Sequence, residues 1–469
     1  MPKPRLLVTI SFSFSIRYIV RTGLLNKLKE FCVPVIGITW NEEELIEELK
    51  RDGFEVHVIP ENKREPLYND VRKKIDFWFD HFCLKSDSRK IEKRYLNQFI
   101  PYKQKVLSNL RKWYTIAKLY LPFYKAKLFK QEQLLLDTAT NFHELSSFID
   151  TLNIDAVFTV TPFHRQEDIL LRVCKLKGKK MITSILSFDN ITKRGWIPID
   201  YDLYMVWNEN NKQQLHHIYP FTLNKPVYVT GAAQFDFYFR KEFLLAFEEW
   251  KSIMGLPTVN NRKIILYAGG PQALFPYEPF YLKEIDEAIS NGLIKGNPLV
   301  LFRCHPIDRI KRWKDVTDKS NNIVFDISWT GKEKPGNTNI TVNDIKKLCS
   351  TLAYTDIHIN LCSTMTVDGT AFDKPQIGPA YVKNNKRQEK LLQGMYMQEH
   401  FMPVLNSGGL RLATSPGQMI RLINDALQNG KNNYTMKGQL LKNIISYPDG
   451  KNTDRVAEEI KNYIVGEFN

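Results

Sequence analysis

Short apolar runs alternate with amphipathic stretches along most of the chain. Such runs are typical of strands buried on both faces, and apolar positions spaced by three to four residues are typical of helices. In the first half the pattern predicts helices at residues 19–31, 41–52, 166–177 and 211–218. It predicts strands at residues 6–11, 33–39, 54–59, 156–160, 181–186, 203–207 and 227–230. Strands that alternate with helices indicate a parallel sheet covered on both faces.

The alternation begins again after a helical segment at residues 235–254 and a loop at residues 255–261. Here the pattern predicts helices at residues 280–291, 341–352 and 416–428, and from Met365. It predicts strands at residues 263–268, 299–303, 323–326, 357–361 and 376–377. We therefore expect an α/β protein with two Rossmann-like domains facing a central cleft, where the carboxyl ends of the strands bind ligands.

Residues from about 64 to 148 interrupt the first alternation, because they have helical periodicity and many aromatic residues but few strand signals. We interpret them as a helical insertion in the N-terminal domain. The expected domains are residues 1–240 and 258–440, and residues 441–469 are expected to form a C-terminal helix that packs back on the N-terminal domain.

The first 19 residues contain an apolar run behind Lys3 and Arg5, as a secretory signal would. Serines alternate with Phe and Ile through residues 11–16, which favours a strand, and Arg17 and Arg21 follow. No stretch has the 18 or more apolar residues of a membrane-spanning helix. The six cysteines include no C-x-x-C pair, which favours a reducing compartment. We expect a cytoplasmic protein, peripheral at the inner face of the membrane.

The net charge of +15 is concentrated in one window. Residues 90–130 contain eleven basic residues with interleaved aromatics, and Glu92 is their one acidic residue. This composition suits an anionic membrane surface. A solvated helical face with its aromatic side buried explains it equally well, and nucleic acid is a weaker alternative, because no recognised nucleic-acid motif accompanies the charge.

Two motifs suggest a phosphate site. The strand at residues 299–303 ends in Arg303-Cys304-His305-Pro306, and a guanidinium beside an imidazole suits a phosphate through charge-assisted hydrogen bonds. A structural histidine bonded to a loop is the alternative. The strand at residues 357–361 leads into a turn and a helix whose hydroxyls are Ser363, Thr364 and Thr366. These could bind an anion at the helix start or simply cap the helix.

Together the two motifs resemble the HP motif and the serine motif of GT-B glycosyltransferases that act on bacterial surface polysaccharides. Sialyl- and Kdo-transferases and CDP-glycerol glycerophosphotransferases look similar here. The resemblance implies that His305, Ser363 and Thr364 contact the phosphate of a nucleotide donor. The resemblance extends over residues 180–380, and few motifs support it before residue 180.

Further donor-binding residues are implied by the same resemblance. Gly269 and Gly270 follow the strand at residues 263–268, like the first loop of a donor domain, and Glu278 lies in a matching stretch at residues 275–279. Asp368 occupies the place of an acid that holds the donor ribose, although an exposed acid favoured by the helix dipole explains it equally well. The C-terminal domain would thus bind the donor, and the N-terminal domain the acceptor.

Asp189 and His164 are the candidates for a catalytic base, because both follow strands of the N-terminal domain. Asp189-Asn190 could instead be a turn held by its own side chains. The predicted function is a metal-independent glycosyltransferase of polysaccharide biosynthesis at the cell envelope, moving a sugar from a nucleotide-sugar donor to a surface-glycan or lipid-linked acceptor without a cofactor. The alternatives are a glycerophosphotransferase, a nucleotide-sugar 2-epimerase, and, outside enzymes, a basic nucleic-acid-binding protein.

Overall fold

The computed structural model describes residues 2–61, 63–84, 86–257, 262–326, 338–430 and 437–466. They form two compact units. Unit 1 consists of Met1–Arg89, Phe99–Gln234 and Lys451–Asn469, and unit 2 consists of Lys90–Gln98 and Phe235–Gly450. The expected loop at residues 255–261 and the domain start at residue 258 lie partly outside the described residues.

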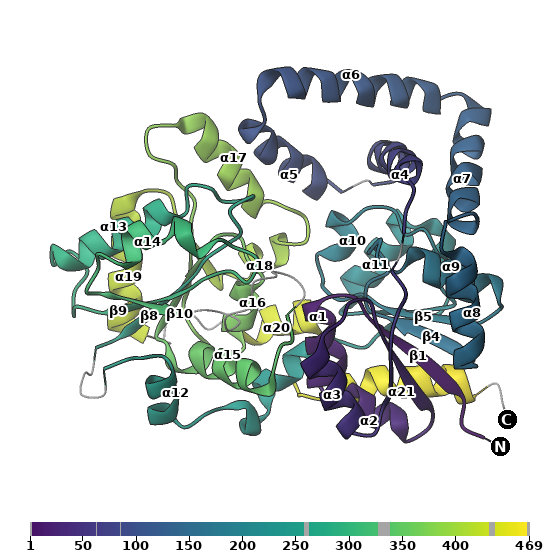
Figure 1. Ribbon diagram of the computed structural model, residues 1–469. Helices are drawn as coiled ribbons and strands as arrows, with labels where there is room; N and C mark the ends of the chain where they lie inside the picture. The colour runs from purple at the N-terminus through teal and green to yellow at the C-terminus, as the bar shows by residue number, and fades with distance from the viewer. Residues whose placement is uncertain are drawn as a thin grey trace. The chain divides into compact units, whose positions relative to one another are not determined.

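A parallel sheet forms the centre of unit 1 (Figure 1). Its seven strands, counted over the described residues, have the order β3-β2-β1-β4-β5-β6-β7. They are β1 (Arg5–Ile10), β2 (Val33–Ile38), β3 (Glu55–Val58), β4 (Ala156–Thr159), β5 (Lys180–Ser184), β6 (Leu203–Val206) and β7 (Val227–Val229). All seven lie where the apolar pattern predicts strands.

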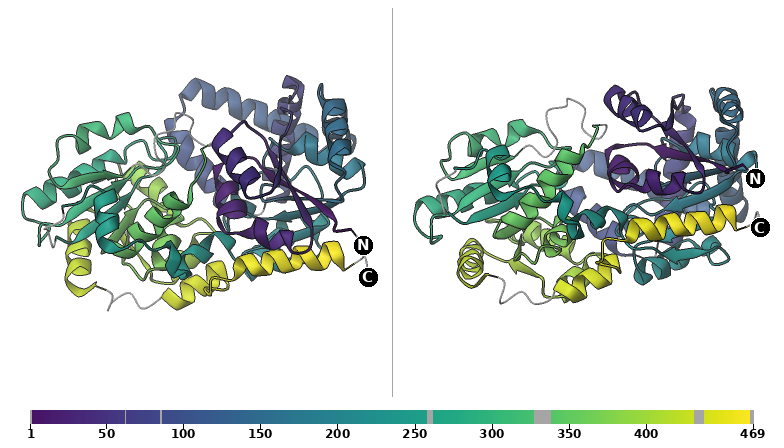
Figure 2. Two further views of the ribbon diagram at one scale, coloured as in Figure 1. Left: turned by 60° about the horizontal axis from the view of Figure 1, so that its bottom comes forward. Right: turned by 90° about the horizontal axis from the view of Figure 1, so that it is seen from below.

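Helices cover both faces of this sheet, because alternate residues of each strand point to opposite sides. Leu7 belongs to one apolar core with α8 (Phe142–Leu152), α9 (Asp168–Leu176) and α11 (Glu209–Ile218). Leu6 and Val8 belong to the other core, with α2 (Leu24–Lys29), α3 (Glu43–Arg51) and α21 (Asn452–Val465). Figure 2 shows α21, in yellow, beside the purple helices of unit 1. The last helix of the chain thus completes the core of the unit that contains the first strand.

The expected helical insertion is present between β3 and β4. Its members before α8 are α4 (Pro66–Trp78), a π-helix (Phe79–Cys83), α5 (Ser88–Leu96), a 3-10 turn (Asn97–Phe99), α6 (Tyr102–Leu119) and α7 (Pro122–Asp137). A buried ion pair between Arg72 and Glu132 joins α4 to α7. Among the described residues, no helix is long and apolar enough to cross a membrane.

Unit 2 contains a second parallel sheet, with six strands over the described residues in the order β10-β9-β8-β11-β12-β13. The strands are β8 (Ile264–Ala268), β9 (Leu299–Arg303), β10 (Ile323–Asp326), β11 (Ile357–Asn360), β12 (Gln376–Pro379) and β13 (Leu410–Ala413). The helices are α12 (Phe247–Ile253), α13 (Pro279–Ser290), α14 (Lys314–Thr317), α15 (Val342–Tyr354), α16 (Met365–Thr370), α17 (Lys386–Tyr396), α18 (Met402–Asn406), α19 (Pro416–Asn429) and α20 (Lys437–Ile445). Each unit therefore has the strand–helix alternation of a Rossmann-like domain.

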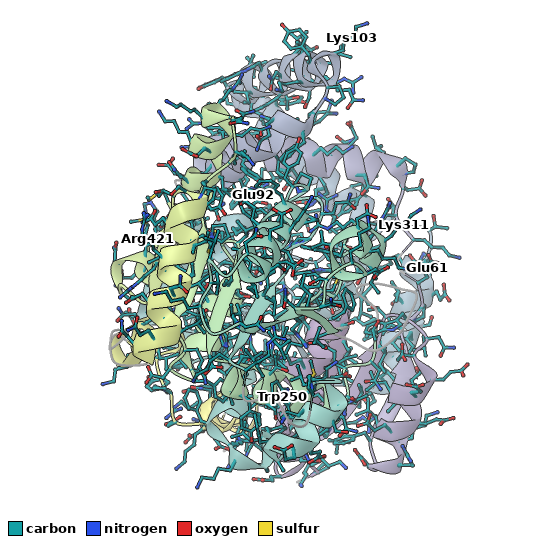
Figure 3. The ribbon with its side chains drawn as sticks, turned by 90° about the vertical axis from the view of Figure 1, so that its left-hand side faces the viewer. Glu61, Glu92, Lys103, Trp250, Lys311 and Arg421 are labelled. Carbon is teal, nitrogen blue, oxygen red and sulfur yellow. The ribbon has the colours of Figure 1, made fainter. Side chains whose placement is uncertain are left out.

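Two predicted elements differ from the structure, and one strand of the structure was not predicted. The strand at residues 6–11 ends at Ile10, and the serine-rich stretch after it is helical, as α1 (Ser13–Ile16) and a π-helix (Arg17–Arg21). The serines of this stretch are buried and its phenylalanines are half-exposed. The alternation of serine with apolar residues therefore does not correspond to a strand with one apolar face. Residues 235–254 form 3-10 turns and α12 (with buried Trp250, labelled in Figure 3) rather than one helix. The pattern also missed β13.

Candidate functional site

The strand order of unit 2 reverses between β8 and β11, and such a switch point is where α/β sheets bind ligands. Ala268, at the end of β8, lies level with Arg303 of β9 and with Asn360 of β11. Neighbouring strands lie about 4.8 Å apart, so the loops after these three strands leave one edge of the sheet side by side. The sheet thereby brings together the predicted glycine, Arg303–Pro306 and serine motifs.

The glycine turn, Gly269-Gly270, follows β8 and has no room for side chains. A Cβ on Gly269 would lie 3.2 Å from the Trp313 ring, and one on Gly270 would lie 2.6 Å from the Phe275 ring. The N–H of Gly269 donates to the carbonyl of Arg303 at 2.9 Å. A side chain at Gly270 would collide with the Phe275 ring, and one at Gly269 would press on the Phe302 and Trp313 rings, which favours glycine at both positions.

Glu278 holds the glycine turn from the protein interior. Its side chain is buried, and its Oε2 accepts the N–H of Gly270 at 2.7 Å and Nη2 of Arg312 at 3.2 Å. The hydroxyl of Tyr267 lies 3.4 Å from Oε1. Burial raises the pKa of Glu278 to about 8. These contacts support a structural role, and a direct contact of Glu278 with a donor remains a prediction.

Arg312 links the glycine turn to the loop after β9, and the sequence analysis did not find it. Its Nη2 donates to the carbonyl of Gly270 at 2.9 Å, and its Nη1 to that of Phe275 at 2.7 Å. Its Nε donates to Asp308 Oδ2 at 2.8 Å. The guanidinium also lies 4.5 Å from the centre of the Trp313 ring. The one signal in the sequence is the spacing of four residues between Asp308 and Arg312, just after the Arg303–Pro306 motif.

His305 follows β9 and is half-buried. Burial lowers its pKa to about 4, with Asp308 raising it and Arg312 lowering it further, so the ring is neutral at pH 7. Its Nδ1 accepts the N–H of Ile307 at 3.3 Å, which assigns the ring proton to Nε2. A neutral imidazole with an Nε2–H can donate one hydrogen bond to an anionic oxygen.

Arg303 lies deeper than His305. Its Nη1 donates to Asp326 Oδ2 at 2.5 Å, and Nζ of Lys347 lies 2.5 Å from the other oxygen of Asp326. The side chain of Arg303 is 6% exposed, and that of Asp326 is fully buried. The guanidinium is therefore used in an ion pair at the edge of the sheet, and its contact with a phosphate remains a prediction.

The serine turn, Cys362-Ser363-Thr364, connects β11 to α16. Cys362 has a φ of 43°, which is strained for a residue with a Cβ, and its Sγ donates to the carbonyl of Met395 at 3.0 Å. Ser363 is half-buried, and its Oγ accepts the N–H of Met365 at 3.2 Å. Thr364 is exposed. The turn therefore presents hydroxyls at the same sheet edge as His305.

Two other predicted residues lie inside unit 2. The hydroxyl of Thr366 donates to Asn360 Oδ1 at 2.9 Å, and both residues are buried. The hydroxyl of Tyr238 donates to Asp368 Oδ1 at 2.5 Å, and Asp368 is 6% exposed. These bonds hold the start of α16 in place, and the predicted donor contacts of Thr366 and Asp368 remain untested.

In unit 1 the strand order reverses between β1 and β4. Phe12 follows β1 and His164 follows β4, and their rings stack with centroids 4.7 Å apart. Burial lowers the pKa of His164 to about 4, and the charges of Arg194 and Arg64 lower it further. A neutral imidazole therefore lies at the switch point of unit 1.

Asp189 lies in the loop after β5, the strand next to β4. Its carboxylate is 3.7 Å from Nζ of Lys193, and its side chain is 19% exposed. No side-chain bond from Asp189 caps the short helix α10 (Asn190–Lys193). Both candidate bases of the sequence analysis therefore follow adjacent strands of one sheet.

Solved structures with a similar fold cover almost the whole chain. Staphylococcus aureus MnaA, in a co-structure with UDP, is 10% identical with a TM-score of 0.55, covering 98% of this chain and 97% of that chain. A glycosyltransferase from Rickettsia africae is 14% identical with a TM-score of 0.53, covering 99% of both chains. UDP-GlcNAc 2-epimerase from Neisseria meningitidis, bound to UDP-GlcNAc, is 10% identical with a TM-score of 0.52, covering 97% and 99%. The expected GT-B fold, with two Rossmann-like domains, is confirmed.

The sequence comparisons give the family. No curated protein matches the chain. The family model described as CDP-Glycerol:Poly(glycerophosphate) glycerophosphotransferase matches residues 186–462, more than half of the chain. That span includes the glycine turn, His305 and the serine turn. The chain belongs to this glycerophosphotransferase family and is a transferase of the GT-B glycosyltransferase-type superfamily.

Proposed function

We propose that this protein transfers a group from a nucleotide-activated donor to a hydroxyl of a surface-glycan or lipid-linked acceptor. One observation carries the proposal: β8, β9 and β11 end in register, and their loops hold the glycine turn, His305 and the serine turn. His305 offers an N–H donor and the serine turn offers O–H donors at one sheet edge. A phosphate oxygen is the partner that such donors suit, and a nucleotide phosphate is the leaving group of every activated donor considered.

The reaction forms one bond and breaks one bond. The acceptor oxygen bonds to the transferred group, the bond from that group to the nucleotide phosphate breaks, and its electron pair leaves with the nucleotide. The acceptor proton passes to a base. With CDP-glycerol the new bond is O–P and CMP leaves, whereas with a nucleotide sugar the new bond is O–C and the nucleotide leaves with its phosphates. The family match makes CDP-glycerol the first donor to test.

Unit 2 would stabilise the leaving phosphate. The Nε2–H of neutral His305 and the hydroxyls of Ser363 and Thr364 would donate to the oxygens that gain charge as the bond breaks. Unit 1 would supply the base. His164 can accept a proton as a neutral imidazole, and Asp189 can accept one as a carboxylate, so the variants His164→Asn and Asp189→Asn separate the two.

The test measures turnover with each donor. The protein is incubated with CDP-glycerol or UDP-GlcNAc and a glycerol-phosphate-primed lipid acceptor, and the release of CMP or UDP is followed. His305→Ala should lower kcat by about 10²–10³, the loss that follows removal of one hydrogen-bond donor to a developing oxyanion. The control is His143→Ala, which removes an exposed imidazole of α8. Unchanged turnover in His305→Ala would overturn the assignment, and an epimer formed from UDP-GlcNAc alone would indicate the epimerase.

We also propose that the insertion docks unit 1 on an anionic bilayer, where a lipid-linked acceptor lies. Along α6 and the start of α7, Leu107, Leu110, Trp113, Tyr114 and Phe123 are each more than half exposed. The basic residues of the same two helices are Lys103, Lys105, Arg111, Lys112, Lys118, Lys125, Lys127 and Lys130. Figure 3 shows Lys103 at the outer surface. Exposed rings among cations suit the interface of an acidic membrane.

Vesicle sedimentation tests this docking. The protein should bind vesicles containing phosphatidylglycerol more tightly than vesicles of phosphatidylcholine alone, and added salt should weaken the binding. Trp113→Ser with Phe123→Ser should lower binding at least tenfold. Leu223→Ser, which changes an equally exposed residue elsewhere in unit 1, is the control. Equal binding by the double variant would refute docking through α6 and α7.

A further inference from the structure

We propose that residues 90–98, which come from the helical insertion, form part of the donor site of unit 2, with Tyr95 as the residue that positions the glycine turn. This inference rests on the proposed function, because it assumes that the glycine turn meets the donor.

Residues 90–98 pack with unit 2, although the residues on either side belong to unit 1. Ile91 lies against α17, since its Cγ2 is 3.8 Å from where a Cβ of Gly394 would be. Tyr95 is 6% exposed, and its ring centre is 6.0 Å from that of Phe275. Figure 1 shows α5 and α17 near each other, and Figure 3 labels Glu92 on α5. The segment is therefore packed into unit 2 on two sides.

A line of contacts runs from Tyr95 to the glycine turn. Phe275 lies in the loop that follows the turn, and its ring fills the space beside Gly270 where a Cβ would be. The carbonyl of Phe275 accepts Nη1 of Arg312, which also holds the carbonyl of Gly270. The Tyr95 ring lies beside the Phe275 ring at an interplanar angle of 57°. A residue from a distant part of the chain therefore contacts the ring that packs against Gly270.

The same segment lies near the serine turn. Burial raises the pKa of the Tyr95 phenol, and the charges of Glu278, Cys362 and Tyr277 raise it further. Cys362 is the first residue of the serine turn, and its Sγ donates to the carbonyl of Met395. Met395 directly follows Gly394, which Ile91 contacts. Residues 91 and 95 thus support both loops that are predicted to meet the donor phosphate.

Tyr95 is proposed as a positioning residue and not as a catalytic residue. Tyr95 is buried and acts on the glycine turn through Phe275, so its loss should change donor affinity more than the rate of the chemical step. An aromatic contact of this kind corresponds to about tenfold in an equilibrium constant. Phenylalanine keeps the ring and should keep the contact.

The experiment measures donor binding and kinetics on the full-length protein. CDP, UDP, CDP-glycerol and UDP-GlcNAc are titrated by calorimetry into the wild type and the variants Tyr95→Ala and Tyr95→Phe. We expect Tyr95→Ala to raise the donor Kd and KM about tenfold with little change in kcat or in the acceptor KM. We expect Tyr95→Phe to behave as the wild type.

The control is Tyr354→Ala, which removes the same side chain from α15, where its hydroxyl donates to the carbonyl of Leu245 away from the glycine turn. Circular dichroism and thermal unfolding confirm that each variant is folded. If the wild type binds none of the four nucleotides, the proposed function fails. If the wild type binds one of them and Tyr95→Ala binds it equally well, or if Tyr354→Ala weakens donor binding as much, the role of Tyr95 is refuted.

Discussion

Glu278 should make the stability of unit 2 fall as the pH rises. Its carboxyl is buried, and burial raises its pKa from 4.5 to about 8. The folded chain therefore binds the proton more tightly than the unfolded chain does. The stabilisation is complete below pH 4.5, decreases between pH 4.5 and 8, and is lost above pH 8. At 1.36 kcal/mol for each pH unit, the decrease amounts to about 5 kcal/mol.

Glu278→Gln should remove this dependence and keep the contacts. The amide oxygen can accept the N–H of Gly270 and Nη2 of Arg312, as Oε2 does. The amide NH2 can donate to the hydroxyl of Tyr267, which lies beside Oε1. Since the amide has no proton to lose, we expect the variant and the wild type to be about equally stable at pH 5. At pH 9 the variant should be more stable, by up to about 5 kcal/mol.

Urea unfolding between pH 5 and pH 9, followed by tryptophan fluorescence, measures the difference. Calorimetry on the same samples separates the transitions of the two units. The control is Glu287→Gln on α13, the helix that begins directly after Glu278; the Glu287 side chain is 57% exposed and pairs with Lys283. This control should not change the pH dependence. A constant difference between Glu278→Gln and the wild type at every pH would refute a protonated Glu278.

The other predictions concern packing and buried charge. Gly369→Ala places a methyl group against His358 Nδ1 and Gln376 Nε2, so it should lower the free energy of unfolding by about 1–3 kcal/mol and lower the melting temperature. Arg72→Met leaves Glu132 buried without its cation and should cost about 3–5 kcal/mol in urea unfolding. Adding Glu132→Leu should restore most of that loss, because both charges are then absent. Wild-type melting of Gly369→Ala would contradict the first prediction, and a double variant as unstable as Arg72→Met would contradict the last.

The sequence was sufficient for most of the fold because parallel strands buried on both faces are continuous apolar runs. The sequence pattern did not predict β13, because β13 is a short strand at the edge of the sheet in which Arg411 and Leu412 are only half-buried. The prediction of a strand through residue 11 was wrong for a different reason. Ser13 and Ser15 are small enough to be buried in a helix, so the alternation of serine and phenylalanine there carries no strand signal.

Parts of the candidate site were recognisable in the sequence where its residues are neighbours in the chain. The glycine turn and His305 were found because each follows an apolar strand directly. The partners of Arg303 and Asp368 were not, because Asp326 and Tyr238 lie far away in the sequence. Arg312 was missed because three of its four acceptors, the carbonyls of Gly270 and Phe275 and the carboxylate of Glu278, lie more than 30 residues away in the sequence.

The environments of the aromatic residues in the insertion were also not predictable from the sequence. Composition alone could not separate a membrane surface from a buried helical face. In the structure Tyr95 is buried in unit 2, whereas Trp113 and Phe123 are exposed. One window of similar composition therefore contains residues with two different environments, and only the packing of α5 and α6 distinguishes them.

The division of the chain affects how the protein can be cut and recombined. The polypeptide passes from one unit to the other after residues 89, 98, 234 and 450. A protease that cleaves any one of these connections leaves the units covalently joined by the remaining three. A chimera that exchanges residues 235–450 with those of a relative would receive a foreign glycine turn but keep its own Tyr95. Such an exchange should therefore carry residues 90–98 with it, although they lie more than 130 residues earlier in the gene.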